Sequence, residues 1–213
     1  LNSELKINLF SLTLLISFFG LFFLYNVFLI KNKGLKSIQE DLYLLFYLLF
    51  VYSIFFIFSE KSIDFNYLFL AISSSVSNVG ISLEKTPQKF AFIFLLLIVV
   101  GGSFFSTSSG LRFFKIYSLI KFSINELISH SKPKNIFLNK LAFSDKNMNL
   151  DDFYKYFLTI IIFIISLIVL SSILSIMGLS IDQAFKLSIL TLMNTVNSTS
   201  YGLSEFNFNN LNY

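Results

Sequence analysis

Long stretches without a charged residue alternate with short charged segments along the chain. Four of these stretches contain 24, 18, 22 and 26 residues. They lie between Lys6 and Lys31, between Asp41 and Glu60, between Lys89 and Arg112, and between Lys155 and Asp182. A helix of about 20 apolar residues crosses the hydrocarbon core of a bilayer. The pattern therefore predicts four membrane spans in an all-α integral membrane protein.

Two further uncharged runs, residues 65–83 and 187–204, begin apolar and end polar. Six of the twelve residues 71–82 are Ser or Asn, and seven of the twelve residues 191–202 are Ser, Thr or Asn. Backbone that leaves a helix at membrane depth is tolerated only against protein or water. Each run is therefore expected to form a short helix followed by a polar loop.

The two runs also start alike, with Ser62-Ile63-Asp64 before the first and Ser180-Ile181-Asp182 before the second. Serine caps helix N-termini, and an aspartate in the first turn interacts favourably with the positive end of the helix dipole. Lys186 follows Asp182 by four residues, a spacing that supports a first turn. A first helix over residues 64–75 would be about 18 Å long, near half the bilayer thickness.

The order of these segments repeats, which predicts an internal repeat of helix–pore loop–helix type. Residues 42–128 would form one complete unit, and residues 154–213 a unit that lacks its last span. Residues 129–153 would form a cytoplasmic loop. Residues 1–41 would hold the last span of a preceding unit, over residues 10–30, and another cytoplasmic loop. The chain is thus expected to be a fragment of a longer membrane protein.

Composition narrows the class further, because 55% of the residues are apolar and only 13% are charged. This balance excludes a disordered chain and an ordinary soluble enzyme. The chain has no cysteine and one histidine, His130, which falls in a basic loop. An integral-membrane enzyme would need clustered His, Asp or Glu at the membrane surface, whereas the acids here are scattered. We therefore expect no enzymatic activity, no cofactor and no catalytic residues.

Basic residues are concentrated in two segments, residues 31–41 and 112–155, and the second contains eight Lys or Arg residues. Cytoplasmic loops of membrane proteins carry an excess of Lys and Arg, so both segments are expected in the cytoplasm. The segment from Glu60 to Lys89 would then lie outside. The apolar flanks explain the charge bias better than a nucleic-acid or anion-binding surface does.

Engineered cysteines test this topology, since the chain has no thiol of its own. An impermeant thiol reagent added to intact cells is expected to label Lys85→Cys and to leave Lys33→Cys and Lys134→Cys unlabelled. Labelling of position 134 from outside would contradict the arrangement.

The polar loops have the chemistry of a monovalent-cation filter. A short helix that enters the membrane points its partly negative C-terminal end at the membrane centre, and unwound carbonyls beyond it supply oxygen ligands. Gly80 permits a turn that aims carbonyls at a central axis, and Asn78 can brace that turn. Neither loop contains a carboxylate, which disfavours a filter for divalent cations.

The third uncharged stretch is interrupted by glycine and hydroxyl residues over residues 101–110. Glycine at both ends lowers helix stability, so a break in the helix is expected, where polar backbone could line or obstruct a pore. Tight helix packing through small residues is an equally good explanation of this composition.

Together, the Ser77-Asn78-Val79-Gly80 loop, the glycine- and serine-rich break and the basic pair Arg112 and Lys115 resemble the Trk/Ktr/HKT superfamily of potassium transporters. The chain is most similar to the pore subunit of the bacterial Trk system. That resemblance implies four helix–pore-helix–helix repeats around one pore, with this chain holding the end of the second repeat, the third, and most of the fourth.

The resemblance also implies roles for individual residues. K⁺ would be held by backbone carbonyls of two filter loops, with Gly80 as the filter glycine of the first, and an intramembrane loop would act as the gate. The filter residues are Ser77, Asn78, Val79, Gly80, Ile81, Val196, Asn197, Ser198 and Thr199. The gate residues are Gly101, Gly102, Ser103, Ser106, Thr107, Ser108, Ser109 and Gly110, and Phe105 stands there where the family has a small residue.

The second filter loop departs from the family pattern of Asn-x-Gly followed by Pro or Gly. Asn197 matches the asparagine, which places Thr199 where glycine is expected. A shift to Gly202 restores the glycine but loses the asparagine.

The function implied is potassium uptake across the cell (inner) membrane by a multi-pass transporter. The family resemblance further implies a homodimer, a cytosolic nucleotide-binding regulatory subunit, and coupling to sodium or protons as an option. The basic loop of residues 129–155 would be the docking surface or a solvated linker. The alternatives are a non-transporting membrane anchor or assembly subunit and, with less support, an integral-membrane enzyme. No nucleic-acid partner is expected.

Overall fold

The computed structural model describes residues 3–20, 39–58, 64–81, 88–103, 106–129, 150–196 and 199–203, and these are almost entirely helical. The expected all-α fold class is thus confirmed. In chain order the elements are α1 (Ser3–Phe18), α3 (Gln39–Phe58), α4 (Phe65–Val76), the 3₁₀ turn η2 (Gln88–Phe90), α5 (Ala91–Val99), β1 (Val100–Gly101), β2 (Leu111–Arg112), α6 (Phe113–Ser129), α7 (Leu150–Ile176), α8 (Ile181–Leu192) and the 3₁₀ turn η3 (Thr199–Tyr201).

Two of the described helices are long and apolar enough to cross a membrane: residues Glu40–Phe58 of α3 and Asp151–Ile176 of α7. With 27 residues, α7 is about 40 Å long. Ile162, Ile165 and Ile168 along it are each more than half exposed. A helix that displays so much apolar surface outside the protein core is suited to contact with lipid.

The other two predicted spans have a different form. The prediction of one helix over residues 10–30 is wrong, because α1 begins at Ser3 and ends at Phe18, and Phe19 and Gly20 are no longer helical. The stretch between Lys89 and Arg112 contains only the nine residues of α5 before the helix stops. The chain becomes helical again at Phe113, so the expected break in this span is confirmed.

The sequence predicts both short helices, although the residues at their N-termini interact differently. At α8 the Ser180 Oγ accepts a hydrogen bond from the Gln183 N–H at 3.4 Å, and Lys186 lies 2.6 Å from Asp182, as the sequence predicts. At α4 the N-cap is Asp64, and its side chain makes no capping hydrogen bond. The two short helices begin with similar sequences, but they do not use the same residue of that sequence as the N-cap.

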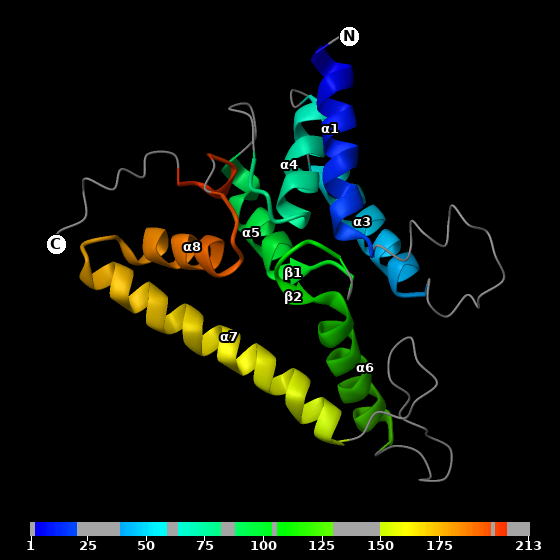
Figure 1. Cartoon of the computed structure of the whole chain (residues 1–213), viewed down its shortest axis with the longest axis vertical. Coiled ribbons are helices and arrows are strands. Elements are labelled where there is room, and N and C mark those ends of the chain that lie inside the picture. The colour runs from blue at the N-terminus through cyan, green and yellow to red at the C-terminus, as the bar shows by residue number, and fades with distance from the viewer. Residues whose placement is uncertain are drawn as a thin grey trace.

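Two helix pairs and the interrupted helix between them organise the fold (Figure 1). The short helix α4 packs beside α1, and the short helix α8 packs beside the long α7. Between the pairs, α5 leads through β1, a loop and β2 into α6. The C-terminal ends of α4 and α8 are thereby directed toward the α5 region.

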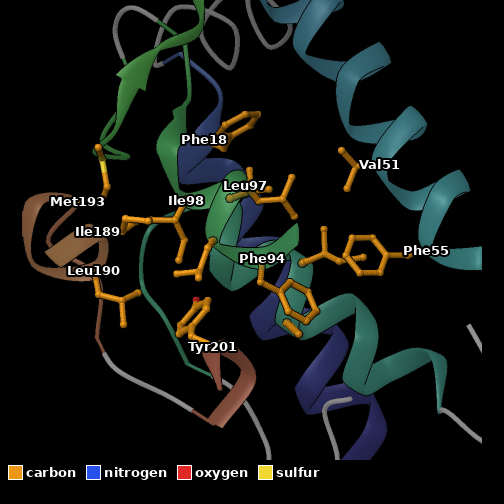
Figure 2. Packing of buried hydrophobic residues seen from close by; sticks show 14 of the residues in the cluster. Phe18, Val51, Phe55, Phe94, Leu97, Ile98, Ile189, Leu190, Met193 and Tyr201 are labelled. Carbon is orange, nitrogen blue, oxygen red and sulfur yellow. The ribbon is translucent and has the colours of Figure 1, made fainter. Parts of the chain in front are cut away.

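The hydrophobic core surrounds α5, as Figure 2 shows. Phe94 and Ile98 on α5 are fully buried, and Phe94 stacks on Phe55 of α3 with ring centroids 5.2 Å apart. Leu190 of α8 and Tyr201 of η3 belong to the same cluster. One core thus joins the two short helices to the interrupted one. The division into repeats at residues 42, 129 and 154 stays a prediction.

The connecting segments that carry Lys33, Lys85 and Lys134 lie outside the described residues, as does His130. The topology and the docking role of the basic loop therefore also remain predictions.

Candidate functional site

The loop after α4 turns sharply at Asn78. This residue has a φ of 62°, a left-handed conformation that few residues other than glycine adopt, and Gly80 follows with a φ of 81°. The N–H of Val79 reaches back to the carbonyl of Ser74 at 3.0 Å, which satisfies one of the free carbonyls at the helix end. The Asn78 side-chain amide donates to the Ile98 carbonyl at 2.8 Å. Asn78 thus makes a hydrogen bond of the kind expected to brace the loop, and the backbone turns at Gly80, while the part of either residue in a filter stays a prediction.

The loop after α8 begins with the same turn. Asn194 has a φ of 52°, and the N–H of Thr195 donates to the Leu190 carbonyl at 2.8 Å, which is the bond that Val79 makes to Ser74. Each helix therefore ends in a left-handed asparagine followed by a residue bonded five positions back. This equivalence aligns Asn194 with Asn78, Thr195 with Val79, and Val196 with Gly80.

The two loops meet backbone to backbone. The Val196 N–H donates to the Val79 carbonyl at 3.2 Å, and a Cβ placed on Gly80 would collide with the Val196 carbonyl and lie 2.7 Å from Thr195 Cγ2. Glycine at position 80 is therefore required both by its backbone conformation and by the approach of the second loop. Ser75 and Tyr201 connect the same two regions, with their hydroxyls 3.2 Å apart.

The predicted filter residues are thus only partly described. Ser77, Asn78, Val79, Gly80 and Ile81 form one continuous loop, and Val196 from the second loop lies directly against it. Asn197 and Ser198 lie outside the described residues, and Thr199 begins the turn η3.

The resemblance to the transporter family places Asn197 at the filter asparagine, whereas the geometry of the helix ends favours Asn194. Asn194 and Thr195 were missed by sequence reasoning, although an Asn one residue beyond the C-cap was a readable signal in both loops. Val196 then occupies the position of Gly80. Among described non-glycine residues, only Asn78 and Asn194 have a positive φ, so Val196 does not reproduce the Gly80 conformation.

The residues predicted to form the gate lie in a loop that separates α5 from α6. Its ends are held by β1 and β2, which pair in parallel with Val100 opposite Leu111 and Gly101 opposite Arg112. A Cβ on Gly101 would lie 2.6 Å from the Ser109 carbonyl, so the two ends approach more closely than side chains would permit. The structure therefore excludes a continuous packed helix here, while small residues are still needed for packing.

Serine hydroxyls take over the hydrogen bonds that a helix would have made. The Gly102 N–H donates to Ser108 Oγ at 2.9 Å, and Ser106 Oγ donates to the Ser103 carbonyl at 2.8 Å. Ser103, Ser106 and Ser108 are all buried. Hydroxyl side chains near their own backbone compete with helical bonding in this way, which explains why a serine-rich segment is non-helical.

Arg112 holds the loop from its C-terminal end. Its Nη1 lies 3.2, 3.1 and 3.0 Å from the carbonyl oxygens of Ser103, Ser106 and Ser108, and 2.9 Å from Ser106 Oγ. The guanidinium thus gathers three carbonyls of the loop around one positive charge. Sequence reasoning had noted Arg112 only as part of a basic pair after the break.

The end of α1 is attached to the same loop. The Ser103 N–H donates to the Phe18 carbonyl at 3.1 Å, and the Thr107 N–H donates to the Ser17 carbonyl at 3.2 Å. These bonds use carbonyls at the C-terminal end of α1 that have no partner within the helix. They give the physical reason why α1 stops at Phe18 instead of continuing through the predicted span.

Asp41, in the first turn of α3, is a second residue that the sequence reasoning missed. Its side chain is only 4% exposed, and Oδ1 accepts a hydrogen bond from the Gly20 N–H at 3.0 Å. A Cβ on Gly20 would lie 2.7 Å from Ser103 Oγ and 3.5 Å from Asp41 Oδ1, so the three residues are closely packed. Asp41 therefore ties α3 to the end of α1 beside the loop.

Comparison with known proteins identifies a solved structure of similar fold. No family model and no curated protein matches the chain. The crystal structure of the potassium transporter TrkH from Vibrio parahaemolyticus superimposes with a TM-score of 0.73 at 17% sequence identity. The similarity covers 91% of this chain and 44% of the TrkH chain, so the chain spans less than half the length of that transporter. At this identity the match establishes the architecture, and the protein has the fold of a TrkH potassium transporter over nine tenths of its length.

Proposed function

We propose that the protein carries potassium across a membrane through a filter built from the loops after α4 and α8, under the control of the loop between β1 and β2. The observation that supports this most strongly is the meeting of the two loops. Two short helices end in the same left-handed asparagine turn, and the backbones that follow join through the Val196 N–H and the Val79 carbonyl.

Electrostatics favours a cation at this junction. The C-terminal end of each short helix carries a partial negative charge of about half an electron, and both α4 and α8 point that end toward the contact. Beyond the helix ends the backbone is unwound, which leaves carbonyl oxygens to replace the hydration shell of a monovalent ion. The fold similarity to a potassium transporter makes K⁺ the first ion to test.

The loop of residues 101–110 is proposed as the gate, because it interrupts a membrane helix and also touches the second filter loop. Ser109 Oγ donates a hydrogen bond to the Met193 carbonyl, at the C-cap of α8. Besides the backbone bonds to α1 and the β1–β2 pairing, the loop is held by side-chain contacts from Arg112 and from serine hydroxyls. These side-chain contacts can be exchanged without unfolding α5 or α6, which would give the loop a second arrangement.

The organisation around this pore is also part of the proposal. We expect α3 to α6 to form one repeat and α7 to α8 most of the next, in a multi-pass protein of the cell membrane. A homodimer and a cytosolic nucleotide-binding regulator would complete the system. A membrane anchor without transport remains the competing function.

Potassium uptake by the full-length protein tests the proposal. Expression in cells that lack their own K⁺ uptake systems is expected to restore growth at low external K⁺, and the purified protein in liposomes is expected to release trapped K⁺ down its gradient. A variant with Gly80→Asp serves as the matched inactive control. Well-expressed protein that neither restores growth nor conducts K⁺ would favour the anchor.

A further inference from the structure

Ser109, at the end of the gating loop, is bonded to the second filter loop. Its hydroxyl donates to the carbonyl of Met193, the C-cap residue of α8, and the Thr195 hydroxyl lies 3.3 Å from the same oxygen. The contact joins residues 84 positions apart in the chain. A carbonyl at a helix C-terminus lacks an intrahelical partner, so the Met193 oxygen is available to both hydroxyls. Met193 lies next to the core around Ile98 and Ile189 (Figure 2).

Gly110, the next residue, lies beside the Ile98 carbonyl, which accepts the hydrogen bond from Asn78 in the first filter loop. A Cβ on Gly110 would lie 3.0 Å from the Ile98 carbonyl, and that carbonyl accepts the side-chain amide of Asn78 at 2.8 Å. The Ser109 carbonyl in turn lies 2.6 Å from a Cβ placed on Gly101. Residues 109 and 110 are thus packed against anchoring groups of both filter loops.

We propose that Ser109 is a positioning residue through which the state of the gating loop sets the selectivity of the filter. This inference rests on the proposed transport function. When the loop rearranges, the Ser109 hydroxyl leaves the Met193 carbonyl, and the chain from Met193 to Val196 loses its hydrogen bond to the loop. The Val196–Val79 hydrogen bond transmits that change to the loop that contains Gly80.

The consequence is that an opened gate also changes discrimination between K⁺ and Na⁺. Selectivity depends on how closely carbonyl oxygens match the hydration shell of the ion, so small displacements of a filter loop alter it. One hydrogen bond contributes about 1 kcal/mol, which corresponds to roughly a fivefold change in an equilibrium. Loss of the Ser109 bond is therefore expected to lower the K⁺/Na⁺ preference roughly fivefold.

The experiment compares two hydroxyls of the same loop. Ser109→Ala removes the bond to Met193, while Thr107→Ala removes a hydroxyl whose hydrogen bond, 3.3 Å to the Ser17 carbonyl, goes to α1. Both variants of the full-length protein are reconstituted in liposomes, and K⁺ and Na⁺ flux are measured separately per purified molecule. Ser109→Thr keeps a hydroxyl at the position, and Ser109→Cys keeps the size with a weaker donor.

The proposal expects Ser109→Ala and Ser109→Cys to lose selectivity, Thr107→Ala to keep the parental ratio, and Ser109→Thr to restore it. If Ser109→Ala fails to fold, Ser109→Cys decides by the same ratio. Changed total flux with an unchanged K⁺/Na⁺ ratio in the Ser109 variants would overturn the coupling and leave the transport function intact. Equal loss of selectivity in Thr107→Ala would also overturn it, because a general loosening of the loop would then explain the result. A parental protein that conducts neither ion would overturn both proposals.

Discussion

Gly80→Ala is expected to reduce the preference for K⁺ over Na⁺ by about tenfold or more, while the protein still folds. A φ of 81° costs an alanine roughly 1–2 kcal/mol, and its Cβ would lie 2.8 Å from the Val196 nitrogen and collide with the Val196 carbonyl. The second filter loop would have to move away to relieve this contact. Gly80→Asp adds a charge that traps the ion, so it is expected to abolish transport.

Gly202 offers a matched control for this prediction. Its φ of 72° imposes the same backbone strain on alanine, but the nearest atom to an added Cβ is Lys186 Nζ at 3.4 Å, a flexible side chain. K⁺ and Na⁺ flux are measured in liposomes for both alanine variants. Parental selectivity in Gly80→Ala would show that the glycine only packs. Equal loss in Gly202→Ala would assign the effect to strain, or to Gly202 as the second filter glycine.

Arg112→Gln is expected to raise basal K⁺ flux several-fold and to make it less dependent on any regulator. The substitution removes the charged donor that holds the carbonyls of Ser103, Ser106 and Ser108 together, and hydrogen bonds from a charged group contribute about 1.5–3 kcal/mol. Without that donor the loop loses its preference for the present arrangement. Flux normalised to purified protein gives the measurement.

Lys115→Gln is the control, because it removes the same charge three residues further along the chain, in the first turn of α6. Arg112→Lys is expected to be intermediate, since an ammonium is a compact charge that lacks the planar array of donors. A lower yield of Arg112→Gln with parental flux per molecule would identify the loop as a packing element and contradict the gate.

The conformation of the loop after α4 could be predicted from the sequence because it depends on neighbouring residues. A short apolar helix, a dense run of Ser and Asn, and one glycine are sufficient to predict a helix end with a left-handed turn, and Asn78 and Gly80 both adopt it. The break after α5 was accessible for the same reason, since glycine and serine disfavour a helix on their own.

The second loop shows where local reasoning leaves two alignments open. Its helix end resembles that of the first loop at Asn194 and Thr195, yet the sequence offers a second asparagine at position 197 and no glycine beside either of them. The hydrogen bond between Thr195 and Leu190 favours the alignment at Asn194, and this bond depends on where α8 ends. A motif match could not supply that information.

The sequence by itself determined the two membrane-compatible helices α3 and α7, the two short helices with polar loops and the non-helical segment of residues 101–110. Each of these follows from hydrophobic length and from backbone preferences within about 20 residues. Only the tertiary structure decided that α1 ends at Phe18, that Arg112 collects the carbonyls of the loop, and that Ser109 reaches Met193. The contacts of α1 and of Ser109 join residues brought together by the packing of different helices around α5, where carbonyls at helix ends accept the donors that this packing supplies. The Arg112 contacts lie within one loop, and they form because the chain doubles back between β1 and β2.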